Sequence, residues 1–185
     1  MIGIATLAAL TSLFPVDATI SVDPAVRYQT WEGWGTSLCW WANVIGTYPE
    51  PLRTQLTDQA IGGLQLNIVR YNIGGGENPE MQTMEPRARM AGFLRPDGTY
   101  DWTADPGQRW VLNRAIQQGA NTFEAFSNSP PYFMTNSGSA TGAVGGGDNL
   151  RPDRVRAFAD HLATVVKRFR DHWGVRFHTP SPMNE

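Results

Sequence analysis

The sequence predicts an α/β fold built on a parallel sheet, and it favours part of a (β/α)8 barrel over a doubly wound sheet. Apolar strand patterns alternate with helix patterns along most of the chain, which is typical of parallel sheets with right-handed crossovers. A dinucleotide-binding sheet carries Gly-x-Gly-x-x-Gly after its first strand, whereas Gly33-Trp34-Gly35 lacks the third glycine. The chain also lacks a Gly-Lys-Ser/Thr phosphate loop. These two absences favour the barrel.

The N-terminal region is expected to differ from the rest of the chain. An apolar stretch over 2–14, followed by the small residue Ala18, predicts that residues 1–18 are a signal peptide or its remnant. No Lys or Arg precedes that stretch, so an ordinary buried N-terminal segment is the alternative. Strand-like patterns at 19–22 and 27–31 predict N-terminal strands in the segment 19–30.

Glycines and prolines mark the ends of the first strands and the first helix expected in the barrel. A short strand over 32–35 runs into glycines, and prolines begin a helix over 49–61 that Gly62 ends. The β-branched run 66–71, closed by glycines, predicts a buried strand. The segment 77–103 has no periodicity and is expected to be a long functional loop.

The second half repeats the same order. Apolar spacing predicts a helix over 105–118, and residues 121–126 read as a third strand. An apolar stripe with i, i+3, i+4, i+7 spacing predicts a long amphipathic helix over 152–173, which Gly174 ends. A fourth strand is expected over 175–179.

The composition excludes several classes of protein. With 41% hydrophobic residues and a formal net charge of -2, the chain is not disordered. Neither a nucleic acid nor a membrane is expected as a partner, because the pI is about 5.9 and no apolar run reaches the roughly 18 residues of a membrane span. The single cysteine, Cys39, excludes an internal disulfide framework and a cysteine-based zinc site. No metal or cofactor is expected.

Candidate site residues follow from barrel geometry, because active sites of these barrels lie at the carboxyl ends of the strands. Those ends carry an arginine, amides, a carboxylic acid and aromatic rings, and no Ser or Cys nucleophile paired with His. This set suits a neutral sugar, whose glycosidic oxygen a buried carboxylic acid can protonate. The candidates are Trp34, Trp40, Trp41, Arg70, Asn72, Asn128, Tyr132, Phe133, Asn184 and Glu185.

Four segments resemble glycoside hydrolase family 30, and within it they are most similar to the endo-β-1,6-galactanase group. They are WEGWGTSLCWWA at 31–42, NIVRYNIGGG at 67–76, FSNSPPY at 126–132 and SPMNE at 181–185. The resemblance implies a (β/α)8 barrel with a side β-domain, which the N-terminal strands would join. It also implies a secreted, retaining endo-hydrolase of β-1,6-galactan, the polysaccharide of arabinogalactan side chains.

The resemblance implies roles for individual residues. Glu185 would be the general acid/base, Asn184 would hold the sugar 2-hydroxyl, and Arg70 would orient the carboxylate of the nucleophile. The other candidates would bind substrate. Phe133 stands where the family pattern has tryptophan, so the shape of one sugar subsite is expected to differ.

The family nucleophile comes from the seventh barrel strand, and this sequence contains four predicted strands. Residues 31–185 would therefore form the N-terminal half of a barrel, and the chain alone is expected to be poorly stable and inactive. Alternatives are another family 30 activity (β-1,6-glucanase, glucuronoxylanase or glucosylceramidase), a non-catalytic carbohydrate-binding protein, or an unrelated barrel enzyme acting on a phosphorylated metabolite.

Structural interpretations compete with these roles. Arg70 could be a structural ion-pair partner, the tryptophans could pack in the core, and the Ser127-Asn128-Ser129 run could simply form a turn. Glu124, within the third strand, would have a supporting polar role if its side chain faces the barrel interior. The three histidines lie outside any metal-binding spacing.

Overall fold

The structure, a computed structural model, describes residues 19–183, which divide into two compact units with the boundary after Glu32. The predicted signal peptide, 1–18, lies outside the described residues. The segment 19–30 contains no strand in this structure, and the predicted N-terminal strands, which would join a side β-domain, stay a prediction. Its apolar side chains are exposed, as for Ile20 and Val22, so alternation along the chain is not accompanied here by the burial that stabilises a strand.

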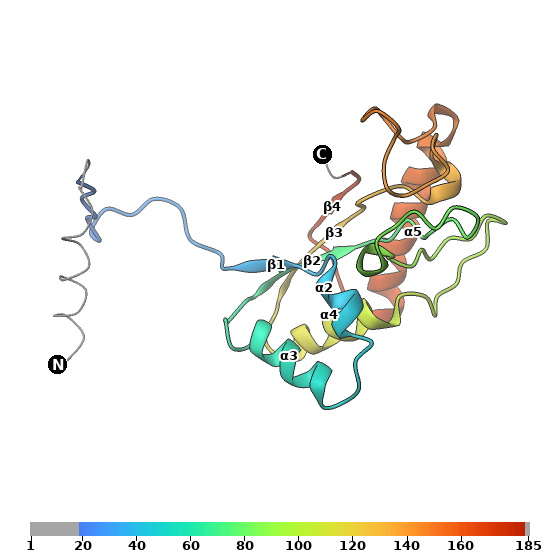
Figure 1. The fold of residues 1–185 in the computed structure, drawn as a ribbon. Helices are drawn as coiled ribbons and strands as arrows, with labels where there is room; N and C mark the ends of the chain where they lie inside the picture. Colours follow the sequence, from blue (N-terminus) through green and yellow to red (C-terminus); the bar gives the residue numbers. More distant parts are fainter. Residues whose placement is uncertain (1–18, 184–185) are drawn as a thin grey trace, which may run out of the picture. The chain divides into compact units, whose positions relative to one another are not determined.

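The second unit contains a parallel sheet of four strands in the order β1-β2-β3-β4, so neighbours in sequence are neighbours in the sheet (Figure 1). The strands are β1 Gly35–Ser37, β2 Ile68–Asn72, β3 Thr122–Phe126 and β4 Thr179–Ser181. Helical segments occupy each connection. This is the architecture of three consecutive βα units and a fourth strand of a (β/α)8 barrel, which agrees with the predicted partial barrel.

The long predicted helices are confirmed, with shifts at their ends. The α-helices are α2 Trp41–Ile45, α3 Leu52–Ala60, α4 Pro106–Gln117 and α5 Val155–Trp173, and the 3-10 turns are η2 Pro86–Ala88, η3 Tyr132–Met134 and η4 Pro152–Arg154. The short helix α2 was not predicted, because five residues are too few to show a helical period. Within residues 19–183, no helix has both the length and the apolar character needed to cross a membrane.

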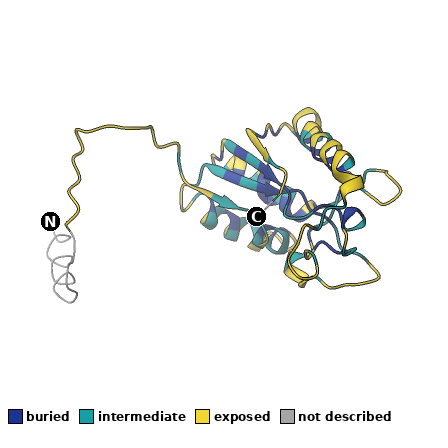
Figure 2. Cartoon of the chain, turned by 90° about the horizontal axis from the view of Figure 1, so that it is seen from above, coloured by how far each residue is buried: buried dark blue, intermediate teal, exposed yellow. Residues whose placement is uncertain are grey.

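Helix α5 shows how the sequence pattern becomes packing. Its apolar stripe buries Phe158, Leu162, Val165 and Phe169. Figure 2 shows the opposite surface of this helix exposed to solvent. Gly174 ends the helix with φ 67°, a left-handed conformation that glycine adopts without strain.

Strand β1 begins later than predicted. The sequence pattern predicts that a strand ends at Gly35, whereas Gly35 is the first strand residue and pairs with Ile68. A Cβ atom on Gly35 would lie 2.7 Å from the Cβ of Ile68, so glycine is required for this close approach and does not mark an end.

The core lies between the sheet and the helices. On β2 the side chains of Val69 and Tyr71 are fully buried, and the Tyr71 ring packs edge-on against Phe169 of α5 with centroids 4.7 Å apart. Helices α2 and α4 meet at glycines, since a Cβ on Gly46 would lie 2.1 Å from the carbonyl oxygen of Gly107. This packing holds the strand ends in place.

Candidate active site

The register of the four strands aligns one residue from each strand in a row across the sheet. Ser37 pairs with Arg70, Arg70 with Glu124 and Glu124 with Thr179. Successive side chains point to opposite faces of a strand, and Tyr71 faces the helices. The row that contains Arg70 therefore lies on the other face, which is the interior face of a barrel.

Arg70 and Glu124 form an ion pair on this interior face. The Nε of Arg70 donates to Oε1 of Glu124 at 2.7 Å, and the two side chains are 32% and 37% exposed. The guanidinium carbon also lies 3.6 Å from the centroid of the Phe126 ring. Two side chains of β3 thus hold the arginine of β2. The structural interpretation of Arg70 as an ion-pair partner is correct for this contact, and Glu124 does face the interior.

Asn72 is buried and makes contacts with two neighbouring loops. Its side chain is 1% exposed, accepts a hydrogen bond at Oδ1 from the backbone N–H of Asn128 at 3.3 Å, and lies with Nδ2 3.5 Å from the Cys39 sulfur. These contacts hold the Asn72 amide between two neighbouring strand ends, and its predicted substrate-binding role stays a prediction. Burial also raises the pKa of the Cys39 thiol to about 12.

Of the three candidate tryptophans, Trp34 lies apart from Trp40 and Trp41, which line the same hollow. Trp34 precedes β1, and its carbonyl oxygen accepts hydrogen bonds from the backbone N–H groups of Asn67 and Ile68. It is therefore at the amino end of the strand, so its predicted place at the carboxyl end is wrong. Trp41 packs against the core and donates from Nε1 to the Ser37 carbonyl at 2.8 Å.

Trp40 and Asn128 line a furrow along the carboxyl side of the sheet. We use this name for three adjoining hollows of about 210, 340 and 510 Å³. The first two share Asn128, Ala140 and Thr141, and the last two share Trp40 and Arg87. All of the shared residues come from loops that follow strands, so the furrow lies on the side where barrel active sites occur.

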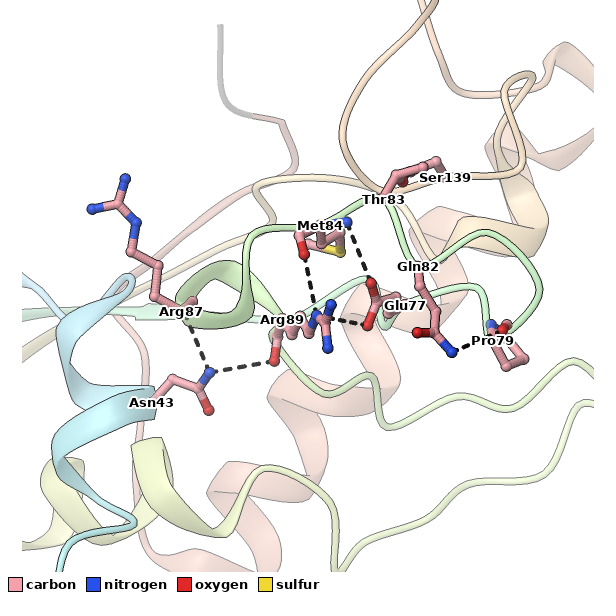
Figure 3. Close-up of polar contacts among 9 residues, drawn as sticks. All are labelled: Asn43, Glu77, Pro79, Gln82, Thr83, Met84, Arg87, Arg89 and Ser139. Carbon is pink, nitrogen blue, oxygen red and sulfur yellow. Dashed lines mark hydrogen bonds and ion pairs between the residues drawn. The ribbon is translucent and has the colours of Figure 1, made fainter.

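The long loop after β2 supplies one wall of the furrow and is anchored by its own side chains (Figure 3). Glu77 forms an ion pair with Arg89 at 3.0 Å, and Arg89 donates from Nε to the Met84 carbonyl at 3.1 Å. Asn43 of α2 donates to the backbone carbonyls of Arg87 and Arg89. In Figure 3 the Arg87 side chain points away from these contacts.

The same loop is joined to the loop after β3. Thr83 and Ser139 share a hydroxyl hydrogen bond of 2.9 Å, and Asn78 donates from Nδ2 to the Gly138 carbonyl at 2.9 Å. These contacts fix the two walls of the furrow relative to each other. The predicted loop over 77–103 is thus ordered by polar contacts over 77–89 and by the buried side chains of Met90 and Phe93.

The two aromatic candidates after β3 belong to the short helix η3. Tyr132 and Phe133 pack edge-on with ring centroids 5.3 Å apart, and Phe133 rests against the hydrophobic core. The Tyr132 backbone N–H donates to the Gly75 carbonyl at 3.0 Å. Neither residue is among those lining the furrow. Both rings are partly buried and make packing contacts in this structure. Their role in substrate binding stays a prediction.

Asn184 and Glu185 lie outside the described residues. The strand that leads to them is described: Ser181, the last residue of β4, pairs with Phe126 of β3. Ser181 also donates from its hydroxyl to the Met183 carbonyl at 3.0 Å. Among residues 19–183, no three or more His, Cys, Asp or Glu side chains are grouped so that they could hold a metal ion.

A buried hydrogen-bond network lies beside β2, where the sequence pattern indicates only the start of a helix at Asp105. Gln108 donates from Nε2 to the Asn72 carbonyl at 2.9 Å, and its Oε1 accepts from the Asn72 backbone N–H at 3.0 Å. Asp105 Oδ2 accepts hydrogen bonds from Gln108 Nε2 and from the Tyr71 hydroxyl. No sequence signal separates this Asp-Pro helix start from an exposed one.

Burial controls the chemistry of this network. It raises the pKa of Asp105 to about 6, against the hydrogen bonds from Tyr71 and Gln108 that lower it. Burial, and then the Asp105 carboxylate, raise the pKa of the Tyr71 hydroxyl well above its usual value. The network ties the start of α4 to the strand end that carries Asn72.

Comparisons with known proteins agree with this geometry. Residues 17–185 match the family described as O-Glycosyl hydrolase family 30. The chain is 31% identical to an endo-beta-1,6-galactanase of Hypocrea rufa, over 97% of this chain and 42% of that protein. It is 28% identical to an exo-beta-1,6-galactobiohydrolase of Bifidobacterium longum subsp. longum, over 90% of this chain and 15% of that protein.

Solved structures give the same result. A conserved exported protein from Bacteroides fragilis superposes with a TM-score of 0.77 at 30% identity, over 89% of this chain and 36% of that chain. The catalytic domain of the GH30 xylanase C from Talaromyces cellulolyticus gives a TM-score of 0.58 at 21% identity, over 89% and 39%, which shows the shared fold. The chain thus spans less than half the length of these relatives, and it belongs to glycoside hydrolase family 30.

Proposed function

We propose that this chain contributes the acid/base half of a retaining endo-hydrolase that cleaves β-1,6-galactan. The observation that carries the proposal is the furrow, which lies at the carboxyl ends of the strands and contains Trp40 and Asn128. The similarity to an endo-beta-1,6-galactanase over 97% of the chain supports the linkage and the sugar.

The chemistry rests on two carboxyl groups roughly 5–5.5 Å apart, as retention requires. Glu185 is the protonated one and donates its proton to the glycosidic oxygen as the bond to the anomeric carbon breaks. Asn184 binds the sugar 2-hydroxyl beside it. The second carboxyl group attacks the anomeric carbon, and Arg70 keeps that group ionised and oriented through charge-assisted hydrogen bonds.

The nucleophile is proposed to lie outside residues 1–185. Support comes from the coverage of the galactanase relative, of which this chain spans 42%. The candidate carboxylate on the interior face, Glu124, is bonded to Arg70 from the neighbouring strand. We propose that Glu124 supports the arginine from its Nε side, and that the attacking group is a different carboxylate. The chain alone is accordingly inactive in this proposal.

An endo-acting enzyme must hold a polysaccharide on both sides of the cleaved bond. The furrow continues through three hollows from the β3 loop to the β1 loop, joined at Asn128 and at Trp40, which suits an extended chain. An aromatic ring on the wall provides a face for a sugar ring. The site is proposed to be extracellular, which the similarity to an exported protein of Bacteroides fragilis supports.

The test is a substrate panel with the full-length enzyme that carries this chain. β-1,6-Galactan should be cleaved to products of several lengths early in the reaction, with retention of anomeric configuration by NMR. β-1,6-Glucan and glucuronoxylan should be poor substrates. Rapid cleavage of one of these with galactan left intact would overturn the substrate, and inversion would overturn the mechanism.

A further inference from the structure

The carboxylate of Glu124 is directed at one specific atom of Arg70. Arg70 and Glu124 are paired residues of neighbouring parallel strands, so their Cα atoms lie side by side and their side chains leave the sheet on the same face. The hydrogen bond of 2.7 Å uses Nε, the nitrogen closest to the backbone. A bond at this nitrogen sets the plane of the guanidinium.

A second contact restricts the rotation of the same group. The Arg70 guanidinium carbon lies 3.6 Å from the centroid of the Phe126 ring, and Phe126 is two residues beyond Glu124 on the same face of β3. The ring supports one face of the guanidinium while the carboxylate holds one edge. Arginine has five N–H donors in a fixed fork, so fixing Nε and one face fixes the direction of the four others.

From these contacts we infer that Glu124 is a positioning residue for the reaction, which acts through Arg70 without contacting the substrate. The inference rests on the proposed function, in which Arg70 orients the nucleophile. In this inference the function of the Glu124 carboxylate is to hold Arg70. The negative charge of Glu124 also offsets the positive charge of Arg70 on the interior face. A partly exposed ion pair stabilises a fold only slightly, so a stability role alone does not account for it.

The test uses the full-length enzyme and whichever β-glycan the wild type cleaves best, so a wrong substrate proposal leaves this measurement intact. Glu124→Ala should lower kcat on the order of 10²-fold with KM nearly unchanged, because the arginine loses its direction and small misplacements are costly. Glu124→Gln keeps an acceptor oxygen at the same place and should restore kcat to within about 3-fold of the wild type.

A matched control is the Asp58–Arg114 pair between α3 and α4, with Nη2–Oδ2 at 2.5 Å and similar exposure. Asp58→Ala removes a comparable ion pair away from the interior face and should leave kcat unchanged. If Glu124→Ala does not accumulate, Glu124→Ser repeats the test with a hydroxyl too short to reach Arg70. Unchanged kcat in the shortened variant, an equal loss in Glu124→Gln, or an equal loss in Asp58→Ala would overturn the inference.

Discussion

The buried carboxyl group of Asp105 should make the stability of this fold depend on pH in a way that one substitution removes. Burial raises its pKa from 3.8 to about 6, so the native state binds this proton more tightly than the unfolded state does. The stabilisation is fully present below the unfolded pKa and is lost as the pH rises through about 6. Asp105→Asn, which is neutral at every pH, lacks this dependence.

The magnitude follows from the shift. A change from 3.8 to about 6 is about 2 pKa units, and at 1.36 kcal/mol for each unit the effect is about 3 kcal/mol. The Asn variant should therefore gain about 3 kcal/mol relative to the wild type between about pH 4 and about pH 7. The asparagine keeps an oxygen that can accept from the Tyr71 hydroxyl, so the volume and one hydrogen bond are retained.

The assay is urea unfolding monitored by tryptophan fluorescence. The wild type and the Asp105→Asn variant are both measured between about pH 4 and about pH 7. Contributions from all other titrating groups cancel in the difference between the two curves. Asp101 is the control with the opposite sign, because hydrogen bonds from Thr103 and Arg95 lower its pKa. Asp101→Asn should lose stability at neutral pH and approach the wild type in acid. Parallel curves for Asp105→Asn and the wild type would refute the reasoning.

The remaining predictions concern the furrow, the helix contact and the isolated chain. Trp40→Ala should raise KM for galactan roughly 3- to 10-fold, while Trp34→Ala, at the opposite end of β1, should leave it unchanged; equal effects would contradict the placement of the furrow. Gly46→Ala should cost about 1–3 kcal/mol in urea unfolding because of the contact with Gly107, and Gly147→Ala, with no atom within 4 Å, should cost much less. Galactan hydrolysis by the 185-residue chain alone, measured as released reducing sugar, should be absent, and its presence would contradict the proposed location of the nucleophile.

Local periodicity predicts much of the fold of 33–183. The stripe of α5 is visible in the sequence because a helix that buries one face repeats its apolar residues at a fixed spacing. The start of β1 is not visible in this way, because Gly35 is required by its contact with Ile68, a residue distant in sequence. Burial is not visible either in the alternating pattern of 19–22, where Ile20 and Val22 are exposed.

The site is less predictable than the fold. The sequence indicates Arg70 and the furrow residue Trp40 as candidate site residues, because each lies near the end of a strand in a recognisable motif. The sequence does not show that Asn72 is buried and bonded to Asn128, because both amides look equally available in a motif. The partnership of Arg70 with Glu124 depends on strand register, which pairs residues far apart in the chain.

The central claim is that Glu185 supplies the proton in glycoside cleavage. The most direct measurement compares wild-type and Glu185→Gln full-length enzymes on β-1,6-galactan and on a nitrophenyl galactoside, whose leaving group needs no protonation. The acid role predicts a loss on the order of 10²–10⁴-fold on galactan and a much smaller loss in the glycosylation step on the activated substrate. Equal losses in that step on both substrates would contradict the claim.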